Sequence, residues 1–162
     1  MYTPWRPESS RRWLALLLLW PALVVAAGPP VRPFGSDTWA EIQATVSRPA
    51  VVVFTTTDCV YCPAVIDDLG RAIHKARSSA KLLVVVMDGA DQESEAVHNG
   101  HLQHADRVYA FDGNAAALRY GVDPAWRGTT PFVVLLPRAG APSFHVGRPK
   151  RALLAALLKP AW

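Results

Sequence analysis

The segment Ala50–Pro63, AVVVFTTTDCVYCP, contains both cysteines of the chain, Cys59 and Cys62. It begins with a continuous run of apolar and mainly β-branched residues, which predicts a strand that is buried on both faces. Pro63 is tolerated only in the first turn of a helix, so a helix is expected to begin near Cys62 and to continue to about Arg77. The two cysteines are therefore expected to lie between a buried strand and the N-terminus of a helix.

Outside this segment, apolar strands and helices alternate along the chain. The turn RAGAPS predicts a hairpin, so the last strand is expected to be an antiparallel edge. The predicted strands are KLLVVVMD (81–88), RVYAFD (107–112), TPFVVLLP (130–137) and SFHVG (143–147), and the predicted helices span 38–46, 91–105, 114–121 and 148–158. The pattern predicts one α/β domain over 37–162, with a mixed sheet and flanking helices, preceded by an extended lead-in over 28–36.

The N-terminal segment has the pattern of an export signal. Arg11 and Arg12 precede an apolar run, Trp13–Ala27, of about 15 residues, which is typical of a signal peptide and short for a membrane span of about 20 residues. Small residues before Gly28 fit a cleavage site. Residues 1–27 are expected to be a signal peptide, or a membrane anchor if the signal is not cleaved. The domain is then expected to be periplasmic or otherwise extracytoplasmic.

The charge of the chain gives no indication of nucleic-acid binding. The formal net charge is +4, but residues 1–27 hold three of the 17 Lys and Arg residues and one of the 13 Asp and Glu residues. The rest of the chain therefore has 14 basic and 12 acidic residues, a net charge of +2. The basic residues are scattered and form no stripe with aromatic residues between them, so no nucleic-acid partner is expected.

The spacing of Cys59 and Cys62 has three possible explanations. A structural disulfide between them would close too small a loop to restrict the unfolded chain. Zinc takes four ligands, and the chain has no second cysteine pair, while the spacing of His98, His101 and His104 puts at most two of them on one helix face. Copper, held by two thiolates and a histidine, stays open. A redox pair fits best, because a helix N-terminus stabilises a thiolate.

Two segments around this motif, VVVFTTTDCVYCP and LRYGVDPAWRGTTPFVVLLPRAG, together with the terminal SFHVG strand and helix, resemble the thioredoxin-like superfamily. Within it, the chain is similar to the exported TlpA/ResA-type thiol–disulfide oxidoreductases, over about Trp39 to Leu158. The resemblance implies a thioredoxin-like α/β fold with a TlpA-type helix–strand insertion between VVVMD and YGV.

The resemblance also implies roles for five residues. Cys59 would be the attacking thiolate and Cys62 the resolving thiol. Thr130 and Pro131, joined by a cis peptide bond beside the cysteines, would line a substrate groove together with Tyr61. The implied activity is disulfide exchange with partner proteins, as a protein disulfide reductase, with cytochrome c maturation as one such process. No cofactor or metal is expected, an upstream membrane electron donor is expected, and the protein is expected to be a monomer.

Several positions depart from these families. Asp58 replaces the usual aromatic residue before the first cysteine, and Val53 stands where thioredoxin has a buried acid, so the proton acceptor for Cys62 and the direction of electron flow stay open. TTDCVYCP also resembles the motif of the Sco copper-binding chaperones, which would use the cysteines and a histidine such as His145. That family spaces its cysteines one residue further apart and has a histidine near the position of Pro131. A non-catalytic thioredoxin-like binding module is the third alternative.

Overall fold

The computed structural model describes residues 1–2, 30–88 and 100–160, so the expected signal segment lies almost wholly outside the described residues. In the described part, six strands form one sheet in the order β1-β4-β3-β2-β5-β6. The strands are β1 (Val31–Phe34), β2 (Ala50–Thr55), β3 (Lys81–Val86), β4 (Arg107–Phe111), β5 (Phe132–Leu136) and β6 (Ser143–Val146). The helices are α1 (Thr38–Thr45), α2 (Cys62–Lys75), α4 (Ala115–Val122) and α5 (Arg151–Leu158), with a 3-10 helix η1 (Gly100–His104).

The sheet is mixed, as the sequence predicts. β1, β4, β3 and β2 run parallel to one another, β5 is antiparallel to β2, and β6 is antiparallel to β5. The parallel strands are connected through helices, and the hairpin of β5 and β6 supplies the antiparallel edge.

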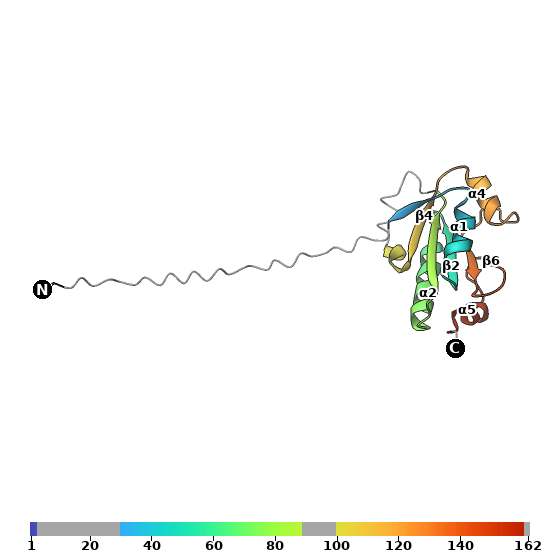
Figure 1. Ribbon diagram of the computed structural model, residues 1–162. Helices are drawn as coiled ribbons and strands as arrows, with labels where there is room; N and C mark the ends of the chain where they lie inside the picture. The colour runs from blue at the N-terminus through green and yellow to red at the C-terminus, as the bar shows by residue number, and fades with distance from the viewer. Residues whose placement is uncertain (3–29, 89–99, 161–162) are drawn as a thin grey trace.

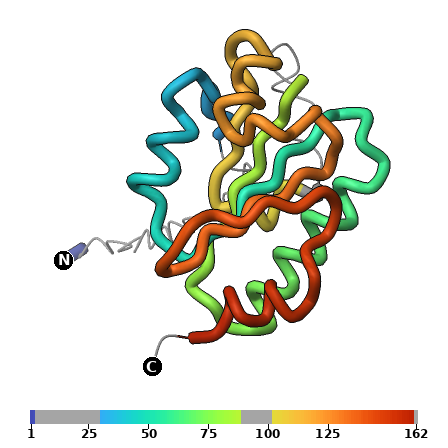
Figure 2. Tube along the Cα trace, turned by 90° about the vertical axis from the view of Figure 1, so that its right-hand side faces the viewer, coloured from blue at the N-terminus to red at the C-terminus, as the bar shows by residue number. Residues whose placement is uncertain are grey.

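Helices cover both faces of the sheet (Figures 1 and 2). On one face, α1 and α4 pack on a cluster rich in aromatic side chains, and on the other face α2, η1 and α5 pack on a mainly aliphatic cluster. The side chains of β2 alternate between the two clusters, with Val52 and Phe54 in the first and Val51 and Val53 in the second. β2 is thus buried on both faces, which explains its continuous apolar sequence.

The first strand differs from the sequence prediction. Residues 28–36 are expected to be an extended lead-in, but Val31–Phe34 forms β1, which pairs in parallel with β4 at the edge of the sheet. Phe34 is 1% exposed, and its ring lies 5.8 Å from that of Phe54 and 5.2 Å from that of Phe111, measured between ring centroids. The ordered sheet therefore begins at Val31, before the expected start of the domain at Asp37.

Most of the helix predicted over 91–105 lies outside the described residues, which resume at Gly100. Its described part contains the short 3-10 helix η1. η1 and β4 lie between VVVMD and YGV, where the resemblance predicts an insertion. Among the described residues, none of the helices has the length and the apolar composition that crossing a membrane requires.

The position of Phe34 predicts a large effect on stability. Phe34→Ala should lower the free energy of unfolding by about 3–5 kcal/mol, because it removes a buried ring from a packed aromatic cluster. The measurement is urea unfolding of the domain. Arg32→Ala is the matched control, because Arg32 is exposed on the same strand and should change stability by no more than about 0.5 kcal/mol. Equal effects of the two variants would show that β1 is not part of the cooperative fold.

Candidate redox site

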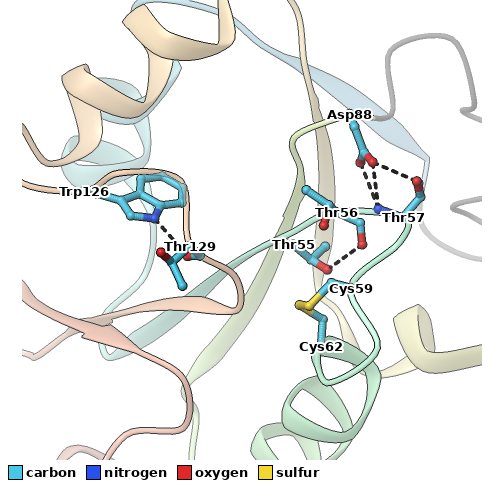
Figure 3. The surroundings of a disulfide bond; sticks show 8 residues. All are labelled: Thr55, Thr56, Thr57, Cys59, Cys62, Asp88, Trp126 and Thr129. Atoms are coloured by element: carbon cyan, nitrogen blue, oxygen red, sulfur yellow. Dashed lines mark hydrogen bonds between the residues drawn. A yellow bond between two sulfur atoms is a disulfide. The ribbon is translucent and has the colours of Figure 1, made fainter.

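Cys59 lies in the connection between β2 and α2, and Cys62 is the first residue of α2. The two form a disulfide with a Cα–Cα distance of 5.4 Å (Figure 3). The two sulfurs differ in burial. Cys62 is the first residue of α2 and is 1% exposed, whereas Cys59 precedes the helix and is partly exposed. Cys59 is therefore the more exposed of the two cysteines.

The sequence of α2 explains this difference. The apolar residues Val65, Ile66 and Leu69 form the buried face of the helix, and Cys62 continues that face by one turn toward the N-terminus. Pro63 occupies the first turn, where its missing N–H costs no hydrogen bond. The N-terminus of α2, and with it the positive end of the helix dipole, therefore lies at the cysteine pair.

Between the cysteines, Val60 and Tyr61 are strongly exposed, with 84% and 77% of their surface accessible. Two backbone hydrogen bonds form within the connection, from Cys59 N to Thr56 O at 3.3 Å and from Cys62 N to Cys59 O at 3.2 Å. The dipeptide therefore places two large exposed side chains, Val60 and Tyr61, next to Cys59. Its expected contact with substrate, through Tyr61, stays a prediction.

The Thr130–Pro131 peptide bond is cis, as the resemblance implies. β2 and β5 are antiparallel with Phe54 opposite Phe132, so Pro131, the residue just before β5, lies at the end of the sheet at which the chain leaves β2 toward Cys59. Pro131 is buried, and its carbonyl accepts a hydrogen bond from Gly147 N at 2.7 Å. The register of β2 against β5 thus brings Pro131 and the connection that contains Cys59 to the same end of the sheet.

Two side chains that the sequence analysis does not single out form hydrogen bonds with the backbone at this end of the sheet. Trp126 stacks on Phe132 with ring centroids 4.2 Å apart, and its indole N–H donates to Thr129 O at 3.0 Å, next to Thr130 (Figure 3). Asp88, just beyond β3, accepts hydrogen bonds from Thr57 in the connection before Cys59. The position of Asp88 at the end of a predicted strand is the one sequence signal that points to it.

The histidines do not join the cysteines in a metal site within the described residues. His145 lies on β6 opposite Val133, with its Nε2 3.1 Å from Ser143 Oγ. His104 packs over Gly70, where an added Cβ would lie 2.6 Å from the His104 Cβ. Across residues 30–88 and 100–160, no three or more His, Cys, Asp and Glu side chains are grouped to hold a metal ion.

This finding bears on the copper alternative, which requires Cys59, Cys62 and one histidine in such a group. The described part of the chain offers no such ligand set. His98 lies outside the described residues, as does the side chain of His101.

The sheet order, the two helix layers and the disulfide at the N-terminus of α2 define a thioredoxin-like fold. No known family model and no curated protein matches the chain. Solved structures do match. MTB dsbF, in its mixed oxidized and reduced forms, is 16% identical, with a TM-score of 0.51 over 72% of this chain and 82% of that chain. This likeness supports the fold assignment.

Two further solved structures have TM-scores of 0.48. A thio-disulfide isomerase from Thermus thermophilus is 24% identical and is matched over 72% of this chain and 81% of its own. A secreted Mycobacterium tuberculosis disulfide oxidoreductase, homologous to E. coli DsbE, is 14% identical and is matched over 68% of this chain and 79% of its own.

The unequal burial of the cysteines predicts an order of chemical labelling. After reduction of the disulfide, iodoacetamide should alkylate Cys59 at least about tenfold faster than Cys62, because the Cys62 sulfur lies in the packed face of α2. Peptide mass spectrometry of samples quenched at successive times measures both rates. Cys59→Ser and Cys62→Ser, each with a single thiol, are the controls. Faster labelling of Cys62 would reverse the proposed roles.

Burial of His145 predicts a dependence of stability on pH. Desolvation lowers the pKa of His145 below its usual value of 6.5, so the unfolded chain binds this proton more readily than the folded protein. The resulting stability is fully present above about pH 6.5 and is lost as the pH falls through the lower pKa of the folded state. Urea unfolding of the oxidised protein between about pH 7.5 and pH 5 should therefore show a steeper loss for the wild type than for His145→Gln. Identical slopes would contradict this.

Proposed function

We propose that this protein is a thiol–disulfide oxidoreductase that exchanges disulfides with partner proteins through Cys59 and Cys62. The observation that carries the proposal is the disulfide at the N-terminus of α2, between a partly exposed cysteine, Cys59, and a buried one, Cys62. A disulfide between residues three apart contributes little to stability, because it closes a very small loop. Reversible disulfide exchange therefore explains the cysteine pair better than a structural role does.

The burial of each sulfur supports an order of steps in the direction of reduction. The Cys59 thiolate attacks a sulfur of the partner disulfide, which forms a mixed disulfide and releases the first partner thiolate. Cys62 loses its proton and attacks the Cys59 sulfur, which forms the Cys59–Cys62 bond and releases the second partner thiolate. The two partner thiolates take up two protons, and two electrons pass from the dithiol to the partner. The reverse sequence oxidises a partner dithiol.

The environment of Cys59 supports its role as the attacking group. Its sulfur lies just before the N-terminus of α2, where the N–H groups and the helix dipole favour negative charge. Cys62, as the first residue of α2, stays within reach of the same sulfur, with Cα atoms 5.4 Å apart. Attack on the mixed disulfide therefore needs little movement of the backbone.

We propose reduction as the physiological direction, with Tyr61, Thr130 and Pro131 lining the substrate groove. The resemblance to TlpA/ResA-type proteins supports this, and it also supports cytochrome c maturation as a process to test. The signal-like residues 1–27 support an extracytoplasmic location. A reductase in an oxidising compartment needs a supply of electrons, so an upstream membrane donor is part of the proposal.

The test of this function uses insulin and glutathione. The reduced wild-type protein should reduce insulin with dithiothreitol as electron source, and Cys59→Ser should abolish the reaction. Cys62→Ser should instead accumulate a mixed disulfide with the partner, visible by mass spectrometry. An equilibrium potential of about −270 mV would support a reductase, and a potential of about −120 mV would support an oxidant. Insulin reduction at the uncatalysed rate would reject the function.

A further inference from the structure

The connection between β2 and α2, residues 56–61, contains the partly exposed Cys59 but belongs to no strand or helix. Its inner hydrogen bonds, from Cys59 N to Thr56 O and from Cys62 N to Cys59 O, are long, at 3.3 and 3.2 Å. When the disulfide opens, as the proposed function requires, one covalent restraint on this connection is lost. The position of Cys59 then depends on the contacts that residues 56–61 make with the rest of the domain.

Asp88 makes such a contact (Figure 3). Its Oδ1 and Oδ2 accept the backbone N–H of Thr57 at 2.9 and 3.0 Å, and Oδ2 also accepts the Thr57 hydroxyl at 2.8 Å. One carboxylate therefore satisfies both donors of a residue that lies two positions before Cys59. The contact is exposed to solvent, but a carboxylate accepts stronger hydrogen bonds than a neutral oxygen does, and all three of these bonds reach the same residue of the connection.

The sheet fixes Asp88 opposite Thr57. β2 and β3 are parallel with Thr55 opposite Val86, and Met87 N donates to Thr55 O at 2.9 Å, which continues the pairing beyond the last strand residue. Asp88 is the next residue, and it extends from the most buried part of the sheet. The Asp88 carboxylate thus links the irregular connection to a strand whose position is set by the sheet.

We propose that Asp88 is a positioning residue for Cys59, an inference that rests on the proposed function. The carboxylate holds the Thr57 peptide, and the neighbouring Thr56 carbonyl accepts the Cys59 N–H. Asp88 therefore acts through the backbone and keeps Cys59 beside Cys62 and the helix N-terminus in the dithiol form. Loss of the contact lowers the effective concentration of one thiol at the other, and the disulfide becomes easier to reduce.

The test measures the dithiol–disulfide equilibrium of the full chain against glutathione. Asp88→Ala should weaken the disulfide about tenfold, a rise of about 30 mV in potential. Asp88→Asn keeps an amide oxygen for the Thr57 N–H but removes the charge, and should stay within about threefold of the wild type. Thr57→Val removes the hydroxyl donor and leaves the Asp88 charge, and should fall between Asp88→Ala and the wild type.

Asp123→Ala is the matched control, because Asp123 Oδ1 also accepts a backbone N–H, from Ala125 at 2.9 Å. It should leave the equilibrium unchanged. Three results would each overturn the proposal: a wild-type potential in Asp88→Ala, an equal shift in Asp88→Asn, which would assign the effect to charge, or an equal shift in Asp123→Ala. If Asp88→Ala does not fold, Asp88→Asn and Thr57→Val decide by the same criteria, since a wild-type potential in Thr57→Val also counts against positioning.

This readout is independent of any partner protein. The glutathione equilibrium needs only the two thiols, so it reports on Asp88 even if the wild type does not reduce insulin. Failure of insulin reduction by the wild type would reject the proposed function alone, and an unchanged potential in the Asp88 variants of an active protein would reject the positioning role alone.

Discussion

Strand β2 pairs with a strand on each side and packs against helices on both faces of the sheet, so its position is constrained by contacts in every direction. All six of its residues are buried, and Val51 to Phe54 are 0% exposed. Burial of this kind contributes about 25 cal/mol for each Å² of apolar surface removed from water. The connection that contains Cys59 starts at the end of this strand. The buried strand therefore positions the start of the connection, whose own residues are mostly exposed.

Three neighbouring strands end or begin at the same end of the sheet, and each leads to a different residue of the proposed site. β2 leads to the cysteines, β3 leads to Asp88, and the start of β5 follows Pro131. The parallel pairing of β2 with β3 brings two C-terminal ends together, while the antiparallel pairing with β5 adds an N-terminal end. A one-residue change of register would turn the side chains of β2 to the opposite faces and separate these parts. Sheet register therefore determines the geometry of the site.

How much of this could be predicted from the sequence depends on the range of the interaction. Strand β2, the start of α2 and the placement of the cysteines follow from local signals, namely a β-branched run and a proline in a first turn. β1 does not, because VRPF is short, contains proline and becomes a strand only by pairing with β4, far along the chain. The hydrogen bonds of Asp88 depend on the register of β2 against β3, which no local pattern specifies. The roles of the site residues stay predictions.

The difference between the two sulfurs shows what a local pattern can still specify. Cys62, Val65, Ile66 and Leu69 follow the i, i+3, i+4, i+7 spacing of one helix face, so the packing that buries α2 also buries the second sulfur. Cys59 lies before the first turn and escapes that face. A buried thiol meets a partner disulfide poorly but can attack a neighbouring sulfur within its own chain. The periodicity of α2 therefore supports the proposed order, in which Cys59 attacks and Cys62 resolves, before any electrostatic effect on either sulfur is considered.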